Sequence, residues 1–267
     1  MKTRKDNLLT LDKFIEESLY NKKNGYYMKK NPFGAKGDFI TSPNISILFS
    51  EMVAIWIISF WENLKCPNKF NLIELGAGNG EMMKTLISTF KKFPKFKKSC
   101  DIKIFEKKIQ FKISQNQKFI EYSFLAAEYL KIITSKIKYN SGGILIIDYG
   151  YNDKKIKNTL QAVSKHKYIN VLKGFKNSDI TYNLNLNLFN QIIKKFGTFN
   201  FFTTNQKNFL TKLGILKRAE ILSKNMTFSN KVNVYFRVKR LIDEKQMGDL
   251  FKVIFITNKK NKFKLGF

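Results

Sequence analysis

Three glycines at alternating positions follow an apolar run in the segment Phe70–Gly80, which reads F-N-L-I-E-L-G-A-G-N-G. Gly76, Gly78 and Gly80 can adopt positive φ and carry no side chain, so backbone N–H groups and the next helix N-terminus can approach a polar ligand. An apolar strand that leads into a glycine turn and then a helix is typical of a nucleotide-cofactor site.

The spacing G-x-G-x-G differs from the G-x-G-x-x-G of dinucleotide folds, and the acidic Glu74 stands two positions before the first glycine. This combination favours S-adenosylmethionine over NAD as the cofactor bound at the glycine loop. A second apolar run, Ile102–Glu106, ends in a carboxylate that a neighbouring strand could offer to ribose hydroxyls. The alternative is a structural glycine turn with an unrelated acid.

Apolar spacing and breakers predict the elements that position this loop. Residues 8–20 have helical spacing, and Ser42 before Pro43 predicts an N-cap with proline at the first helical position, opening a helix through Trp61. A helix over 81–90 and a strand over 102–105 follow. The chain then shows an apolar run at 142–150, helical patterns at 186–196 and 204–217, and strand patterns at 232–238 and 251–256.

The run G-G-I-L-I-I-D-Y-G at 142–150 predicts a buried parallel strand that ends in Asp148. With the preceding elements it predicts an α/β sheet that has helices on both faces and an antiparallel edge. We expect one domain over 1–267, with an N-terminal helical cap at 1–66 and an α/β core at 67–267.

Composition limits the function. The 267 residues have a formal net charge of +29, but the basic residues are almost all lysines, with arginine only at Arg4, Arg218, Arg237 and Arg240. Because specific phosphate and base recognition prefers arginine forks, we expect no specific nucleic-acid partner. The composition suggests codon drift toward A/T as the origin of the lysines, although a lysine-rich surface would still bind polyanions weakly. With two cysteines and one histidine, we expect neither a zinc site nor a disulfide framework.

The longest apolar run, Met52–Trp61, is about half a membrane span, and the N-terminus lacks an apolar signal region. We therefore expect no membrane insertion and an intracellular protein. A bacterial cytoplasm is expected, or a mitochondrial matrix if the source is eukaryotic.

Four blocks of the sequence resemble the MidA-type class I methyltransferase family. The first, at 24–51, contains G-D-F-I-T-S-P-N-I-S, and the second is the glycine loop. The third is the run at 142–150 with T-L-Q-A-V and His166 after it, and the fourth is Q-M-G-D-L-F-K-V at 246–253. Blocks spread over most of the chain make chance similarity improbable.

The resemblance implies a Rossmann-like methyltransferase fold and S-adenosyl-L-methionine as cofactor. It also implies symmetric dimethylation of an arginine in a protein substrate, a subunit of respiratory complex I. A homodimer is compatible with it, although the sequence does not fix the oligomeric state. The implied cofactor residues, with Glu74 added from its place before the loop, are Gly37, Thr41, Ser42, Glu74, Gly76, Gly78, Gly80 and Glu106, and the catalytic candidates are Asp38 and Asp148.

The chain also departs from the family pattern. Asn44, Ile47, Ala77 and Asn79 replace the usual Glu, Gln, Pro and Arg. A larger loss lies between about Phe119 and Glu121, where an internal segment with the acidic block N-E-F-F-D-A-L-P is missing. In the family that block occupies the fourth strand, beside the cofactor strand.

The missing block bears on both catalysis and stability. A guanidinium is a poor nucleophile until a carboxylate localises its charge, and the acids left for that role are Asp38, Glu51, Glu74 and Asp148. Losing a central strand also exposes a sheet edge, unless residues 144–148 pair there instead. We therefore expect a less stable fold.

Three functions remain open. The first is an arginine methyltransferase. The second is a catalytically impaired relative that acts as a binding or assembly factor, as the missing acids suggest. The third, nucleic-acid methylation, lacks the interleaved arginine and aromatic motifs that it would need.

Overall fold

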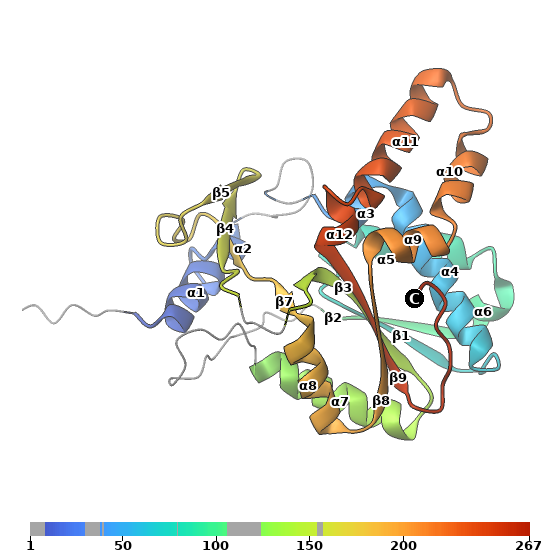
Figure 1. Ribbon diagram of the computed structural model, residues 1–267, viewed down its shortest axis with the longest axis horizontal. Helices are drawn as coiled ribbons and strands as arrows, with labels where there is room; N and C mark the ends of the chain where they lie inside the picture. The colour runs from blue at the N-terminus through green and yellow to red at the C-terminus, as the bar shows by residue number, and fades with distance from the viewer. Residues whose placement is uncertain (1–8, 30–37, 39, 79, 106–123, 154–156) are drawn as a thin grey trace, which may run out of the picture. The chain divides into compact units, whose positions relative to one another are not determined.

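The computed structural model describes residues 9–29, 38, 40–78, 80–105, 124–153 and 157–267 (Figure 1). Contacts divide the chain into two units. The smaller unit takes 1–39, 108–129 and 155–183, and the larger unit takes 40–107, 130–154 and 184–267. These boundaries differ from the expected cap and core, and the single domain stays a prediction.

The larger unit carries most of the helices and strands. Its helices are α3 (Ser42–Ile45), α4 (Ile47–Asn63), α5 (Glu81–Phe90), α6 (Pro94–Ser99), α8 (Leu186–Phe196), α9 (Gln206–Lys212), α10 (Ile215–Ser223), α11 (Phe228–Ile242) and α12 (Met247–Leu250). Its strands are β1 (Phe70–Leu75), β2 (Cys100–Phe105), β3 (Gly143–Tyr151), β7 (Leu184–Asn185), β8 (Phe199–Asn205) and β9 (Phe251–Asn258).

The smaller unit contains α1 (Leu11–Tyr20), α2 (Tyr26–Lys29), β4 (Gln161–Ser164), β5 (Lys167–Ile169) and β6 (Asp179–Thr181). The helix α7 (Phe124–Tyr139) begins in the residue range of the smaller unit and continues in that of the larger. None of the helices in the described ranges is long and apolar enough to cross a membrane.

The strands of the larger unit form two separate sheets. β1 and β2 pair in parallel, from Phe70 opposite Cys100 to Leu75 opposite Phe105. The second sheet has the order β7-β3-β9-β8, in which β9 runs antiparallel to both of its long neighbours. Within the described residues, no pairing joins β1 to β3, so residues 144–148 do not fill the place beside β1.

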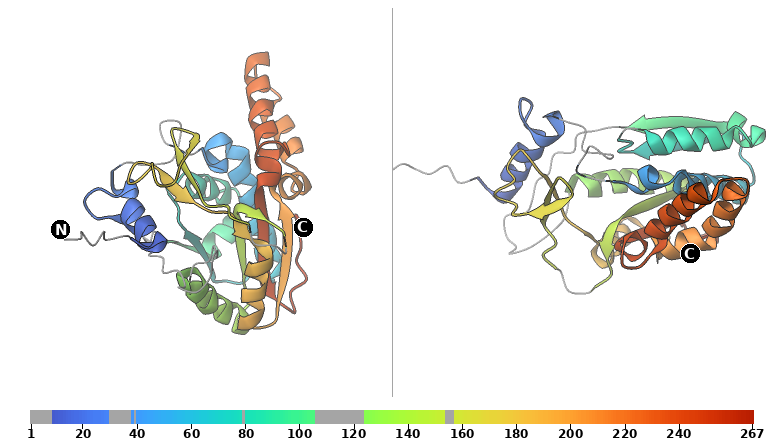
Figure 2. Two further views of the ribbon diagram at one scale, coloured as in Figure 1. Left: turned by 60° about the vertical axis from the view of Figure 1, so that its left-hand side comes forward. Right: turned by 90° about the horizontal axis from the view of Figure 1, so that it is seen from above.

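One hydrophobic core lies against both sheets. The helix α4 buries apolar side chains on most of its circumference, as expected of a helix that packs on two sides. Its Trp56 and Phe60 pack on Phe255 of β9, with ring centroids 4.9 and 5.3 Å apart. The same core includes residues of α5, and Leu72 of β1 packs against it. The opposite face of the larger sheet is covered by α7 and α8 (Figure 2).

The other face of β1 is exposed among the described residues. Ile73 is 53% exposed and Leu75 is 60% exposed, whereas the alternate side chains of the strand are half-buried. Two large apolar side chains on an uncovered strand are unusual in a central sheet. Ile73 and Leu75 project from the face of the sheet, so the missing neighbouring strand stays a prediction that their exposure does not test.

Because the two faces of β1 differ in burial, we expect substitutions of neighbouring residues to have unequal effects on stability. We expect Leu72→Lys to lower the free energy of unfolding by about 2–4 kcal/mol, because it buries a charge against the core. Ile73→Lys should change it by less than about 0.5 kcal/mol, since Ile73 is already exposed. Urea denaturation followed by circular dichroism measures both. Equal losses would contradict this strand register.

Several sequence predictions are corrected. The helix expected from Ser42 to Trp61 is broken at Ser46. The extended backbone of Ser46 ends α3, and its hydroxyl accepts a hydrogen bond from a backbone N–H in the first turn of α4. The strand β3 is mostly half-exposed and not buried, and it runs parallel to the short β7 but antiparallel to its long partner β9. The helix predicted over 204–217 is divided between α9 and α10 at Gly214, and its first residues belong to β8.

Residues 232–238, which we expected to form a strand, lie inside the helix α11. Thr227 caps α11, and the core-facing residues of the helix decide its structure, as explained below. The strand at 251–256 is confirmed as β9. It lies between β3 and β8, and therefore not at the antiparallel edge that the sequence predicted.

Candidate functional site

The glycine loop connects β1 to α5 in the predicted conformation. Gly76, Gly78 and Gly80 have φ of 71, 59 and 75°, in the left-handed region that favours glycine. The Gly80 N–H donates to the carbonyl of Ala77 at 2.9 Å, and Gly80 is the N-cap of α5. A Cβ added at Gly76 or Gly80 would meet no atom within 4 Å. The loop is therefore open toward space that a ligand can use.

Two acidic residues flank this loop in the sequence. Glu74 lies on β1 opposite Ile104 of β2 and is half-buried. Glu106 lies outside the described residues. The strand before it ends at Phe105, which pairs with Leu75 immediately before Gly76, so the carboxyl ends of the two strands are adjacent. Parallel strands present ligands at this end.

Asp148 lies near the carboxyl end of β3. Its side chain reaches solvent, and the backbone N–H of Tyr149 donates to its Oδ1 at 2.8 Å. Crowding by neighbouring protein atoms raises the pKa of this carboxyl to about 6, and the hydrogen bond from Tyr149 opposes that rise. At neutral pH the group is a carboxylate that can accept a proton.

Glu51, one of the acids considered for guanidinium binding, already binds an arginine of this chain. Its two carboxylate oxygens accept from Nε and Nη2 of Arg218 at 2.8 and 3.0 Å, and both side chains are mostly buried. This two-point ion pair joins α4 to α10. The carboxylate therefore has a structural partner.

The described residues of the G-D-F-I-T-S-P block make internal contacts. Thr41 is the N-cap residue of α3, and its hydroxyl lies 2.7 Å from Oδ1 of Asn44. The buried Ser42 hydroxyl bonds Oε1 of Gln206 at 2.9 Å, and Nε2 of that glutamine donates to the carbonyl of Leu241. Ser42 thus ties α3 to α9 and α11. Gly37 lies outside the described residues.

Asp38 belongs to the smaller unit and is buried there. One carboxylate oxygen accepts from the hydroxyl of Tyr26, and the other accepts from the backbone N–H of Lys165 at 2.6 Å. Lys165 and His166 form the two-residue turn between β4 and β5, with φ of 50 and 61°. Positive φ at both positions is typical of a type I′ hairpin turn, which usually contains glycine or asparagine. Asp38 stabilises this strained turn.

The sequence did not reveal a second buried carboxylate in the smaller unit. Asp179 of β6 is 5% exposed and accepts from the hydroxyl of Tyr27 at 2.7 Å. Burial raises the pKa of the Asp179 carboxyl to about 6. The pKa of the Tyr27 hydroxyl lies well above its usual range, because that hydroxyl is buried and lies near the charge of Asp179. The adjacent tyrosines of the motif N-G-Y-Y were the only signal available.

The raised pKa of Asp179 implies that the stability of the folded chain depends on pH. Its folded-state pKa of about 6 lies above the usual 3.8, so between these values the folded state binds more protons than the unfolded state. Its contribution to stability therefore falls as pH rises from about 4 to 6. We expect Asp179→Asn to raise the free energy of unfolding at pH 7 by up to about 3 kcal/mol.

Urea denaturation of the full chain from pH 4 to pH 7 tests this expectation. The difference between Asp179→Asn and the parent should grow with pH, while Glu62→Gln, a change at an exposed carboxyl, should leave the profile unchanged. A pH-independent difference would show that Asp179 is ionised throughout.

Within the described ranges, no three histidine, cysteine, aspartate or glutamate side chains gather as a metal ion would require. The glycine loop, the N-terminus of α5 and the carboxylate of Asp148 are described features that could take part in chemistry.

The fold was compared with solved structures. The crystal structure of a protein from Burkholderia thailandensis, described as a COG1565 superfamily member and likely methyl transferase bound to S-adenosyl-homocysteine, aligns with a TM-score of 0.74 at 15% identity. The alignment covers 97% of this chain and 89% of that chain. A native crystal structure from the same organism aligns with a TM-score of 0.73 at 16% identity. The chain has the class I methyltransferase fold.

A model of a family described as S-adenosyl-L-methionine-dependent methyltransferases matches residues 52–121 and 106–203, which together are more than half of the chain. The chain belongs to this family. The model matches in two segments that overlap at 106–121, around the place where the sequence indicates a missing segment.

Curated relatives match over a shorter region. Protein arginine methyltransferase NDUFAF7, mitochondrial, from Homo sapiens is 37% identical over 109 residues, which are 41% of this chain and 25% of that protein. The Drosophila melanogaster homologue is 44% identical over 80 residues, which are 30% of this chain and 18% of that protein. The matched region spans a quarter or less of the length of these relatives.

Proposed function

We propose that this chain is an S-adenosyl-L-methionine-dependent protein arginine methyltransferase. The observation that carries the proposal is the glycine loop between β1 and α5, with three glycines at positive φ and open space where a Cβ at Gly76 or Gly80 would lie. Support comes from the family and from the relatives named as protein arginine methyltransferases. A subunit of respiratory complex I is the proposed substrate.

In this proposal the loop binds the cofactor through its backbone. Gly76, Gly78 and Gly80 let the chain approach it closely, and the N-terminal N–H groups of α5 face its polar part. Glu74 orients the loop, and Glu106 binds the ribose hydroxyls. The resemblance also assigns Gly37, Thr41 and Ser42 to the cofactor, and of these Thr41 and Ser42 lie in the same unit as the loop. The cofactor supplies a methyl group on a sulfonium centre.

Asp148 is the carboxylate that we assign to the target arginine. A guanidinium spreads its charge over three nitrogens and is protonated at neutral pH. A carboxylate beside it localises the positive charge on the nitrogens that it contacts, which leaves the remaining nitrogen more nucleophilic. Its raised pKa suits Asp148 to accept the proton that this nitrogen loses on methylation. Asp38, with both oxygens engaged, has a supporting role.

Methyl transfer can be measured directly. The purified full chain is incubated with methyl-tritiated S-adenosyl-L-methionine and solubilised complex I, and the methylarginines are separated after acid hydrolysis. We expect label in symmetric dimethylarginine, and at least tenfold less with Asp148→Asn. Label in nucleic acid added to a parallel reaction, with none in protein, would contradict the proposal.

The second candidate function is that of a catalytically impaired binding or assembly factor. It is favoured by the uncovered face of β1 and by the absence, within the described residues, of a strand joining β1 to β3. S-adenosyl-homocysteine binding without methyl transfer to any complex I subunit would support this function. Because relatives are named as mitochondrial, we propose a matrix location if the source is a eukaryote. In a bacterium, we propose that the chain is cytoplasmic.

A further inference from the structure

A pair of helices, α10 and α11, extends away from the sheets of the larger unit (Figures 1 and 2). We call residues 215–242, which contain both helices and their connection, the arm. The base of the arm is fixed by the ion pair between Arg218 and Glu51 and by buried residues such as Ile215 and Leu241. From Lys224 to Arg237, however, the arm contains no buried residue.

The helix α11 has two apolar stripes at helical spacing. The inner stripe consists of Val234, Val238, Leu241 and Ile242, which contact the core. The outer stripe consists of Phe228, Val232, Tyr235 and Phe236, at positions i, i+4, i+7 and i+8. At 100° per residue, the stripes point in directions roughly 120° apart. A helix with two apolar stripes commonly buries both of them, and among the described residues only the inner stripe of α11 is covered.

The outer stripe is exposed to an extent that its residue types do not explain. Phe228 is 83% exposed, Phe236 is 66%, Val232 is 50% and Tyr235 is 43%. Isolated apolar residues on a surface are ordinary, but four on one helix face, two of them phenylalanines, form a contiguous patch. Aromatic residues in such patches commonly anchor protein interfaces.

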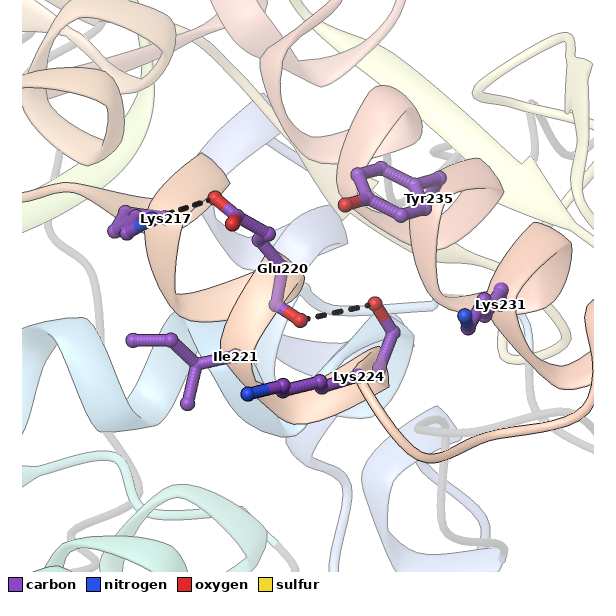
Figure 3. A pocket seen from close by; sticks show the side chains of 7 residues that line it. Lys217, Glu220, Ile221, Lys224, Lys231 and Tyr235 are labelled. Carbon is purple, nitrogen blue, oxygen red and sulfur yellow. Dashed lines mark hydrogen bonds and ion pairs between the residues drawn. The ribbon is translucent and has the colours of Figure 1, made fainter.

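A groove lies beside this stripe, between α10 and α11. It has a volume of about 550 Å³ and is lined by Lys217, Glu220, Ile221, Ser223, Lys224, Lys231 and Tyr235. Figure 3 shows the Tyr235 hydroxyl directed toward α10, and Lys217 bonded to Glu220 at 2.9 Å. Ile221, another exposed apolar residue, is 57% exposed. The groove combines an aromatic wall with a lysine rim.

The charge of the arm restricts its partner. Residues 215–242 contain seven basic side chains and one acidic side chain. A second copy of this chain would bring two such arms together with like charges, which opposes self-association. A lipid surface or a phosphate backbone has no need of a groove, and neither selects a stripe at helical spacing. An acidic partner helix with one apolar face fits both features.

We propose that the arm is a docking surface for an acidic amphipathic helix of a partner protein. The apolar face of that helix packs on the outer stripe of α11, and its carboxylates face Lys224, Lys231 and Lys239. The proposal does not depend on methyl transfer, since no residue of the arm belongs to the cofactor loop.

A designed peptide tests the proposal without knowledge of the natural partner. The probe is a fluorescein-labelled three-heptad helix with leucine and tryptophan on one face and glutamate on the others. A shuffled peptide of identical composition has the same charge and no apolar face. By fluorescence anisotropy, we expect the full chain to bind the ordered peptide at micromolar concentration and the shuffled peptide at least about tenfold more weakly.

Matched variants locate the binding site. The double change Phe228→Ser and Phe236→Ser should weaken binding of the ordered peptide by at least about tenfold, and Lys224→Glu with Lys231→Glu should act similarly. Tyr139→Ser, at an 81% exposed aromatic residue of α7, should have no effect. Circular dichroism confirms that each variant is folded.

Three results would overturn the proposal. Equal binding of both peptides would show attraction by charge alone. Unchanged binding by the double phenylalanine variant would place the peptide elsewhere. A loss of binding to anionic vesicles or to duplex RNA in that variant, without a loss of peptide binding, would assign the outer stripe to a membrane or a nucleic acid.

Discussion

Gly78→Val is expected to weaken S-adenosyl-homocysteine binding by at least about a hundredfold, from the micromolar affinity expected of the parent. Gly78 has φ of 59°, where a β-branched side chain is strained by about 1–2 kcal/mol or more. The valine side chain would also block the close approach of the cofactor to the backbone. Isothermal titration calorimetry of the purified full chain measures both affinities.

A matched control separates a local effect from general backbone strain. Gly214, between α9 and α10, has φ of 86°, and an added Cβ would meet no atom within 4 Å. Gly214→Val should therefore cost similar stability and leave S-adenosyl-homocysteine binding within about twofold of the parent. Glu106→Ala, which removes the proposed ribose ligand, should also abolish measurable binding.

Two outcomes would change the interpretation of the glycine loop. A folded parent chain that binds no S-adenosyl-homocysteine would favour the non-catalytic binding or assembly factor. If Gly214→Val lost binding as completely as Gly78→Val, the loss would report destabilisation of the larger unit and not a site at the loop.

Phe255→Ala is expected to lower the free energy of unfolding by about 3–5 kcal/mol. The Phe255 side chain is fully buried in the middle of β9, and its ring contacts those of Trp56, Phe60 and Phe263. A Cβ at Gly143, on the paired strand, would lie 2.6 Å from this ring, so the ring fills the space beside that glycine and alanine would leave a cavity there.

Urea denaturation monitored by tryptophan fluorescence measures this loss. Phe228→Ala removes the same side chain from an 83% exposed position and should change stability by less than about 0.5 kcal/mol. A small change would also show that the exposed Phe228 side chain is not needed for folding. A loss below 1 kcal/mol for Phe255→Ala would contradict the position assigned to β9 in the core.

The expected loss of stability from the missing segment has a structural counterpart. The larger unit retains its core through α4, which packs on both sheets. Ile73 and Leu75 are exposed, so these two apolar side chains contribute little to stability through burial. The expected lower stability itself stays a prediction.

The sequence by itself determined the local features of this protein. The alternation of glycines after an apolar strand requires positive φ, and the structure has it at Gly76, Gly78 and Gly80. Apolar spacing placed α1, α5, α8 and β9 near their observed bounds. These features depend on neighbouring residues alone, because backbone sterics and helical periodicity act over a few positions.

Only the tertiary structure decided the partners of the acidic residues. Glu51 and Arg218 are far apart in sequence and meet because α10 packs on α4. Asp38 stabilises the turn at Lys165, and Asp179 binds Tyr27, through contacts that no spacing reveals. Carboxylates that are equivalent as sequence candidates therefore differ in what their oxygens contact.

The tertiary structure also decided the conformation of residues 232–238. The order V-N-V-Y-F-R-V alternates enough to resemble a strand, and its β-branched and aromatic residues favour one. Val234, Val238 and Leu241 instead pack on the core at helical spacing, and burial of that face outweighs local propensity. Which strands lie next to each other was likewise settled by packing, because pairing brings together residues that are distant in the sequence.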